Sequence, residues 1–430
     1  MRIGLFTDRY LPQIDGVSFS TESFRHEMEA LGHEVYVFAP RPSWRYKERS
    51  SRIVRFPAVK GLFWEDNLSS LFFPPQVSRQ IDKLNLDIIH FQTPGQIGLF
   101  GAYYAIHNNI PLVTTYHTDL YEYVKHYRAT LPGAIALSLL VPAITGGGMS
   151  DYRQALSSIT PERNIDRWNQ KILMRMITMI HNHCDLVIAP SDKTREQLLG
   201  WKTTSRVETL PTGVDEITTK NREISHVRKL YNIQESDKVM VFVGRVGTEK
   251  NVGLLIRAFA NIARQNEHAK LVIVGQGDDI DSFKKQAAAT PYPDRVIFTG
   301  FIDHLKLGAI FKISSVFGFP SLTDTQGMVI NEAARAGLPV VMVDREISQV
   351  VVEGQNGYFA RNSARDFASK VLKILNNKEL QARMSKRSIE LSGEVTPRKQ
   401  AVKLLRLYEE TIEQHRDTTN KPQKATNSQL

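Results

Sequence analysis

The sequence repeats one pattern in each half: short apolar runs alternate with longer stretches of helical period. In the first half the runs fall at 3–7, 35–38, 87–90, 112–115 and 186–189, with a helix expected at 21–31. After a polar stretch at 216–226 the alternation restarts, with runs at 239–243, 271–275, 296–299, 316–319 and 340–343. This alternation predicts parallel, doubly wound sheets. We therefore expect an α/β chain with two Rossmann-like domains, at 1–212 and 213–396.

The end of the chain follows a different pattern. Val402, Leu405, Tyr408 and Ile412 form an apolar stripe that predicts a helix over 397–416, and the polar residues 417–430 predict a disordered tail. Ligands of open parallel sheets bind beyond the carboxyl ends of the strands. We therefore expect functional residues directly after strands, in a gap between the two domains.

Composition limits the compartment and the partners. Cys184 is the only cysteine, which excludes a disulfide framework and favours the cytoplasm. The first residues do not resemble a signal peptide. The most apolar region, 134–149, contains Pro142 and three glycines and is shorter than the roughly 20 residues of a membrane span. A net charge of +10 favours anionic partners: phosphates, nucleic acid or an acidic lipid surface.

Two cations follow the run at 239–243, in Gly244-Arg245-Val246-Gly247-Thr248-Glu249-Lys250. Arg245 offers a planar fork of donors and Lys250 a point charge, a combination suited to neutralising a departing diphosphate. A solvated loop in which these cations pair with Glu249 explains the same residues equally well.

A second polar segment follows the run at 316–319 and leads through Gly327 into a helix that contains Met328 and Glu332. Close approach at Gly327 would let amides at the helix start hold a phosphate, while Asp324 and Glu332 accept hydrogen bonds from sugar and ribose hydroxyls. The alternative is ordinary capping by Asp324 or Thr325, with Glu332 on a solvated face.

The run at 320–339 resembles the signature of the family-4 retaining glycosyltransferases of the GT-B fold, two acids separated by seven residues and followed by a Gly-x-Pro turn. The run at 244–250 resembles that family's diphosphate clamp, and Pro211-Thr212-Gly213-Val214-Asp215 its Pro-x-Gly-Val/Ile-Asp segment. Asp324 departs from the pattern, since glutamate is usual there. The resemblance implies two domains facing across a cleft, a last helix crossing back to the first domain, a nucleotide-sugar donor without a tightly bound cofactor, and retention of configuration.

The resemblance also implies residue roles. Glu332 would hold the donor ribose, Asp324 a sugar hydroxyl, and Arg245 and Lys250 the diphosphate. His117, directly after the run at 112–115, would line the sugar and acceptor site, although a lone histidine is more often structural. The remaining donor contacts would be Gly16, Phe301, Ile302, Gln326, Gly327, Met328 and Val329. His90 and His183 are expected to be packing or surface residues. Asp278, Asp279 and Asp281 are expected to cap the start of a helix, where acidic residues are favoured electrostatically, so no metal site is expected.

The acceptor is predicted from the first domain. Seven cations face only Glu48 over residues 41–60, and Trp44, Tyr46, Phe63, Trp64, Phe72 and Phe73 lie among or after them. This mixture suits an anionic membrane surface, and a solvated loop with packed aromatics explains it equally. Tyr116-His117-Thr118, followed by Tyr121-Glu122-Tyr123-Val124-Lys125-His126-Tyr127, resembles the bacterial diacylglycerol glucosyltransferases.

We therefore expect transfer of glucose from UDP-glucose to a membrane lipid such as diacylglycerol, by a peripheral enzyme on the inner face of the cell membrane. Alternatives are GDP-mannose as donor, a soluble or polyprenyl acceptor, or a noncatalytic nucleotide-sugar-binding protein. Nucleic acid is not an expected partner, because no zinc, helix-turn-helix or RNA-binding signature accompanies the charge.

Overall fold

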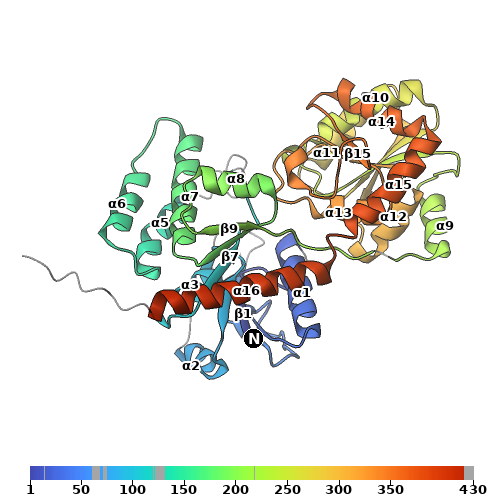
Figure 1. Cartoon of the computed structure of the whole chain (residues 1–430). Helices are drawn as coiled ribbons and strands as arrows, with labels where there is room; N and C mark the ends of the chain where they lie inside the picture. The colour runs from blue at the N-terminus through green and yellow to red at the C-terminus, as the bar shows by residue number, and fades with distance from the viewer. Residues whose placement is uncertain are drawn as a thin grey trace, which may run out of the picture. The chain divides into compact units, whose positions relative to one another are not determined.

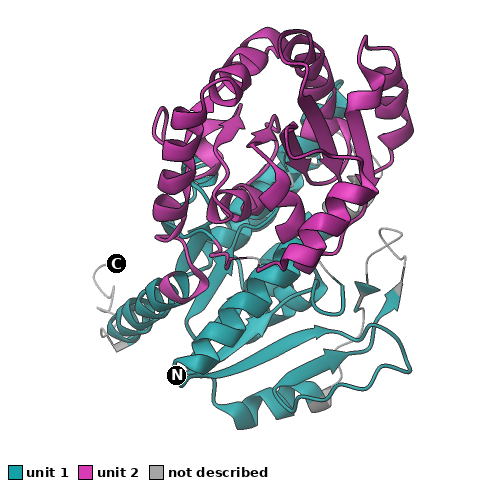
Figure 2. Ribbon diagram, turned by 90° about the vertical axis from the view of Figure 1, so that its right-hand side faces the viewer, with its two compact units in different colours: residues 1–211, 400–430 teal, residues 212–399 magenta. Residues whose placement is uncertain are grey.

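The computed structural model describes residues 1–420, apart from Ile14, 61–67, 71–74, Leu120, 122–130 and Ile217. The chain divides into two compact units (Figure 2). Unit 1 holds Met1–Pro211 and Gln400–Leu430, and unit 2 holds Thr212–Lys399. Each unit has a parallel sheet and a hydrophobic core of its own, as the double alternation predicted.

Unit 1 is built on a seven-stranded parallel sheet of order β3-β2-β1-β6-β7-β8-β9. Ile3 of β1 lies opposite both Val35 of β2 and Ile88 of β6, so the strand order reverses beside β1. Such a reversal opens a crevice at the carboxyl ends of the strands, where ligands bind. A separate antiparallel pair joins β4 and β5. The strands are β1 Arg2–Phe6, β2 Glu34–Pro40, β3 Ile53–Phe56, β4 Val59–Lys60, β5 Leu68–Ser69, β6 Ile88–Phe91, β7 Leu112–Thr115, β8 Leu186–Ala189 and β9 Arg206–Thr209.

Helices cover both faces of this sheet (Figure 1). One face buries Phe6 and Phe38 in a cluster that includes side chains of α3 and α7, and the other buries Ile3 and Leu5 with side chains of α1 and α16. Burial on both faces explains why the strands are almost continuously apolar. The helices are α1 Gly16–Ala30, α2 Pro75–Leu84, α3 Gln96–His107, α5 Leu131–Ile144, α6 Met149–Ser158, α7 Ile165–Asn182, α8 Asp192–Gly200 and α16 Pro397–Asn420.

Helix α16 returns the chain to unit 1, which confirms the predicted crossing. Its Tyr408 is fully buried and hydrogen-bonds through its hydroxyl to His90 Nδ1 at 2.6 Å. His90 Nε2 bonds in turn to Thr115 Oγ1 at 2.8 Å, and burial lowers the pKa of His90 to about 3. His90 is therefore a neutral packing residue. The helix continues to Asn420, so the tail predicted from Asp417 is wrong for its first four residues, and 421–430 lie outside the described residues.

Unit 2 repeats the design with a six-stranded parallel sheet of order β12-β11-β10-β13-β14-β15. Here the order reverses beside β10, which pairs with both β11 and β13. The strands are β10 Lys238–Val243, β11 Ala269–Val274, β12 Val296–Gly300, β13 Val316–Phe319, β14 Val340–Met342 and β15 Gly357–Phe359. The helices are α9 Asn221–Leu230, α10 Val252–Gln265, α11 Ile280–Ala288, α12 Leu307–Ile313, α13 Met328–Arg335, α14 Ala364–Leu375 and α15 Lys378–Ser392, with short 3₁₀ turns η2 Thr248–Lys250, η3 Pro293–Arg295, η4 His304–Lys306 and η5 Arg345–Ile347.

Several elements were absent from the predicted pattern. Strands β3, β9 and β15, each at an edge of its sheet, were not predicted, whereas the fourth edge strand of the two parallel sheets, β12, overlaps the expected run at 296–299. An edge strand needs no continuous apolar run, because one of its sides has no neighbouring strand. The polar stretch at 216–226 contains the start of α9, which has no fully buried residue and turns only Ile224 and Val227 toward the core of unit 2.

The buried hydrogen bond of Tyr408 gives a stability prediction. Tyr408→Phe keeps the ring but leaves His90 Nδ1 without its partner, so we expect unfolding to become easier by about 1–3 kcal/mol. Tyr36→Phe is the matched control, because that hydroxyl bonds to Glu34 at an exposed position. All four tryptophans lie in 1–211, so urea unfolding followed by tryptophan fluorescence reports on unit 1. Equal losses in both variants would contradict a structural role for the Tyr408–His90 bond.

Candidate active site

The loops after β10 and β13 meet in unit 2 because these two strands are neighbours in the sheet. Lys250, at the end of η2, donates from Nζ to Asp324 Oδ1 at 2.5 Å, and both side chains are largely buried. Two residues that the sequence placed in separate motifs are thus brought into direct contact. Arg245 differs, since its side chain is 54% exposed and its Nε lies 3.9 Å from Glu249 Oε1. For Arg245 the structure therefore matches the alternative of a solvated loop in which this side chain pairs with Glu249.

Gly327 begins helix α13 in a left-handed conformation, with φ 65° and ψ 56°. A side chain is unfavourable in this conformation, and a Cβ here would approach Ile330 Cδ1 to 2.8 Å. Helix α13 has no side-chain cap, so the alternative in which Asp324 or Thr325 caps it is wrong. Its first amides are left for a ligand or water.

Gln326 lies beside this glycine but is engaged elsewhere. It is buried, its Oε1 accepts from the Thr212 amide at 2.9 Å, and its Nε2 donates to the Thr212 carbonyl at 2.8 Å. Both ends of the side-chain amide therefore hold the first residue of unit 2. This anchoring role differs from the donor contact predicted for Gln326.

Glu332 lies on α13 and is only 7% exposed, which contradicts the alternative of a solvated face. Its Oε1 is 3.0 Å from His304 Nε2 on η4. The hydrogen bond to Glu332, opposed by partial burial, raises the pKa of His304. The motifs did not predict a role for His304. It lies in the loop after β12, however, and functional residues were expected directly after strands. The same loop carries Phe301, which is 68% exposed, and the partly buried Ile302.

The loop of Arg245 and Lys250 is fixed from a third side. A Cβ at Gly275, where φ is 137°, would come within 1.9 Å of the Gly244 carbonyl oxygen, so the loop after β11 packs directly on the loop after β10. Asp279 accepts from the amide and the hydroxyl of Thr248, at 2.8 and 2.7 Å. Asp279 stands at the N-cap of α11, but its carboxylate makes no cap hydrogen bond there. The predicted capping role is therefore wrong for Asp279, which positions the cationic loop instead.

Unit 1 brings together residues at the carboxyl ends of β6 and β7. His117 Nε2 lies 2.7 Å from Gln92 Oε1, an arrangement in which the imidazole donates and keeps Nδ1 as an acceptor. Burial lowers the pKa of His117 to about 4, although the charge of Asp15 opposes the shift. The ring is therefore neutral at pH 7. Asp15 caps α1 by accepting from the Ser18 amide at 2.9 Å, which places Gly16 at the first helical position.

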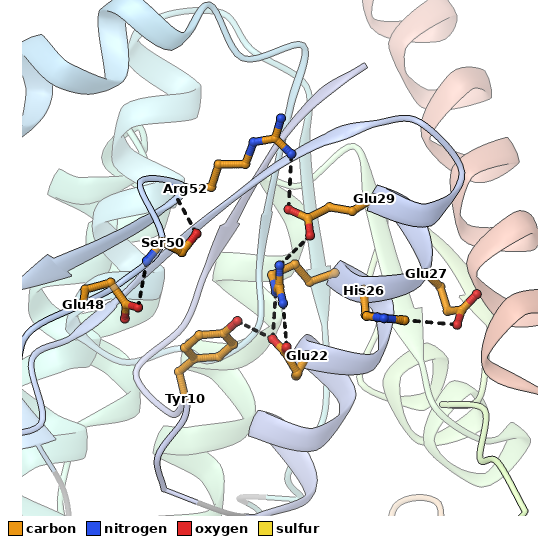
Figure 3. A network of polar contacts seen from close by, with 9 residues as sticks. Tyr10, Glu22, His26, Glu27, Glu29, Glu48, Ser50 and Arg52 are labelled. Atoms are coloured by element: carbon orange, nitrogen blue, oxygen red, sulfur yellow. Dashed lines mark hydrogen bonds and ion pairs between the residues drawn. The ribbon is translucent and has the colours of Figure 1, made fainter.

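The basic segment at 41–60 divides into structural and exposed cations. Arg55 is almost fully buried, pairs with Glu48 at 2.9 Å and stacks over the rings of Tyr10 and Tyr46. Arg52 reaches Glu29 at 3.5 Å in the network of Figure 3. Arg41, Arg45, Lys47, Arg49 and Trp44 are exposed. Phe63, Trp64, Phe72, Phe73 and residues 122–127 lie outside the described residues.

Within the described ranges, no three His, Cys, Asp or Glu side chains gather in a group that could hold a metal ion. In the same part of the chain, no helix combines the length and the apolar character needed to span a bilayer.

Comparison with known proteins identifies the family. Residues 14–216 match the family described as Glycosyltransferase Family 4, and residues 224–391 match the family described as Glycosyl transferases group 1. The chain is a family-4 glycosyltransferase. This confirms the resemblance found in the motifs, and the noncatalytic alternative is not supported. Members of the family typically take a nucleotide sugar as donor.

Individual relatives agree with the family. The chain is 29% identical to an alpha-monoglucosyldiacylglycerol synthase of Streptococcus pneumoniae, over 79% of this chain and 70% of the relative. It is 26% identical to the protein of the same name from Acholeplasma laidlawii, over 90% and 91%. A GDP-mannose-dependent alpha-mannosyltransferase of Corynebacterium glutamicum is 25% identical over 79% and 72%. Anabaena HepE in complex with UDP and glucose superposes with a TM-score of 0.67 at 15% identity, covering 95% of this chain and all of that one, which shows the GT-B fold.

The contact between His304 and Glu332 predicts a titration. Because the folded state raises the pKa of His304 above its ordinary value of about 6.5, the pair stabilises unit 2 below that pH and loses this effect as the pH rises through the raised pKa. NMR titration of the imidazole, assigned with His304→Gln, should show this raised pKa in the native chain. Glu332→Gln should lower it below 6.5, since partial burial remains while the charge is lost. An unchanged pKa in Glu332→Gln would show that Glu332 is not the cause.

Proposed function

We propose that this glycosyltransferase moves glucose from UDP-glucose to a membrane lipid acceptor such as diacylglycerol, with retention of the anomeric configuration. Two contacts in unit 2 carry the proposal. Lys250 meets Asp324, which precedes the start of α13 at Gly327, and His304 meets Glu332 within that helix. These residues offer cations and amides for a diphosphate and carboxylates for hydroxyl groups. The names of the two glucosyldiacylglycerol synthases support the choice of sugar and acceptor.

The donor site is proposed for the domain at 213–396. Arg245, Lys250 and the amides of Met328 and Val329 would hold the diphosphate, with close approach allowed at Gly327. Asp324 would bind a sugar hydroxyl and Glu332 the ribose, while Phe301 and Ile302 would lie near the base. Lys250 already pairs with Asp324, so a donor diphosphate would share its ammonium group with that carboxylate.

The acceptor site is proposed for the domain at 1–212. Gly16 would allow close approach to the donor phosphates, and neutral His117, oriented by Gln92, would hydrogen-bond the reacting sugar or acceptor. In the transfer step the acceptor hydroxyl oxygen bonds to the anomeric carbon as the bond to the β-phosphate oxygen breaks. The hydroxyl proton passes to the departing phosphate, whose growing charge Arg245 and Lys250 stabilise.

We propose a peripheral location on the inner face of the membrane. Exposed Arg41, Arg45, Lys47, Arg49 and Trp44 would meet anionic headgroups. The name of the mannosyltransferase relative supports one alternative donor, GDP-mannose. The alternative to a membrane lipid is a soluble or polyprenyl acceptor.

The decisive experiment is transfer of labelled glucose from UDP-glucose to diacylglycerol in anionic vesicles. Arg245→Ala and Glu332→Ala should each lower kcat/KM by about 10²–10³-fold, because each removes a charged contact to the donor. Arg264→Ala is the matched control, an exposed arginine in the last turn of α10. The anomeric configuration of the product, measured by NMR, should be the same as that of the donor. Inversion, or transfer only from GDP-mannose, would overturn the corresponding part of the proposal.

The lowered pKa of His117 predicts the pH profile. With a pKa of about 4, the neutral imidazole is present throughout pH 5.5–7.5, so kcat/KM should show no acid limb from His117 in that range. His117→Asn should lower kcat by about 10²-fold without changing the shape of the profile. A limb near pH 6.5 that disappears in His117→Asn would show that the ring titrates during turnover.

A further inference from the structure

Large exposed apolar side chains gather in one part of unit 1. The helices α5, α6 and α7 lie between β7 and β8 in the sequence, and they pack on one another (Figure 1). The exposed apolar side chains of these helices are Leu139, Leu140, Met149, Tyr152, Leu156 and Ile165. Six large exposed apolar side chains on three helices that pack on one another can mark a binding or membrane surface.

The exposed side chains follow helical spacing. Leu139, Leu140 and Ala143 lie on one exposed stripe of α5, and Met149, Tyr152 and Leu156 lie three and four residues apart on α6. Residues at this spacing share one face of a helix. We call the exposed side chains Leu139, Leu140, Met149, Tyr152 and Leu156 the α5/α6 face.

Polar groups of the same helices turn inward. Ser138 of α5 and Ser158 of α6 are completely buried, and their hydroxyl oxygens lie 3.3 Å apart. Ser158 also donates to the Ala155 carbonyl at 2.6 Å, and Thr145 donates to the Val141 carbonyl at 2.9 Å. The same helices also bury Val141 and Ala155 in the core of unit 1, so their exposed leucines are not needed to cover that core.

The distribution of charge favours a lipid bilayer over a protein partner as the occupant of this face. The sequence contains no charged residue from 131 to 150, and the next cations, Arg153, Arg163 and Arg167, are exposed. A protein partner normally forms about one hydrogen bond per 100–200 Å² of interface. The apolar side chains of this face supply no such donors beyond the Tyr152 hydroxyl, whereas hydrocarbon requires none and anionic headgroups attract arginine.

We propose that the α5/α6 face inserts shallowly into the acyl region of a lipid bilayer, with Arg153 at the level of the headgroup phosphates. The inference rests on the proposed lipid acceptor and deepens it, because it assigns a hydrocarbon contact that is separate from the basic segment at 41–60. The occupant is a membrane containing anionic lipid, and association with a second copy of the chain is an outcome of the test.

The first test measures insertion directly. Leu140→Cys, labelled with an environment-sensitive fluorophore, should shift to shorter emission wavelengths when phosphatidylcholine–phosphatidylglycerol vesicles are added to the full chain. Cys184 is buried, so the label attaches at the introduced thiol. Leu230→Cys, on exposed α9 of unit 2, is the matched control and should not shift. A shift of equal size at both positions, or none at Leu140→Cys, would overturn the proposal.

The second test measures affinity and separates it from catalysis. The triple variant Leu139→Gln/Leu140→Gln/Leu156→Gln should bind these vesicles at least about 10-fold more weakly by sedimentation, since it replaces three apolar side chains that the proposal places in the bilayer. The control Leu230→Gln/Ile389→Gln/Val402→Gln changes exposed apolar residues elsewhere and should bind normally. Without vesicles, both triple variants should hydrolyse UDP-glucose at the same rate. If UDP-glucose is not the donor, neither variant will hydrolyse it, whereas the measurement of vesicle binding is unaffected. Unchanged vesicle binding, or dissociation of a dimer by light scattering without a change in vesicle binding, would overturn the proposal.

Discussion

A parallel sheet must bury both of its faces, and it presents its polar connections together at the carboxyl ends of its strands. Both units obey this constraint, with cores on either side of β1 and around β10. Because the faces are fully occupied, chemistry is confined to the loops beside the strand reversals. His117 and Gln92 lie there in unit 1, and Lys250 and Asp324 lie there in unit 2.

The interior strands were predictable because burial on both faces requires an unbroken apolar run, and β7, β8 and β13 match the expected limits. Three of the four edge strands, β3, β9 and β15, were not predicted: each is only three or four residues long, and β3 and β9 include the charged residues Arg55 and Glu208. The motifs pointed to the loops after β10 and β13, but spacing along the chain cannot specify which side chains meet. Hence the contacts of His304 with Glu332 and of Asp279 with Thr248 appear only when separate loops are brought together.

The two carboxylates of the signature are each committed to a cationic or titratable group from another loop. Asp324 is one methylene shorter than the usual glutamate, yet it reaches Lys250 at 2.5 Å. Glu332 is buried against His304. If the proposed donor binds here, its diphosphate would share the Lys250 ammonium group with Asp324, and its ribose would meet a carboxylate that His304 already holds in place. Such preorganisation lowers the reorganisation needed during transfer.

Unit 1 is discontinuous in sequence, since its Tyr408 arrives from α16 after the whole of unit 2. A ribosome makes the chain from the amino terminus, and domains generally fold as units during synthesis. Unit 2 is therefore complete while one face of the unit 1 sheet is only partly covered. The cluster that contains Ile3 and Leu5 already has side chains of α1 but still lacks those of α16. The amino-terminal half of the protein is thus the later of the two to finish folding, and a nascent chain stalled before residue 400 would expose apolar surface for chaperones to bind.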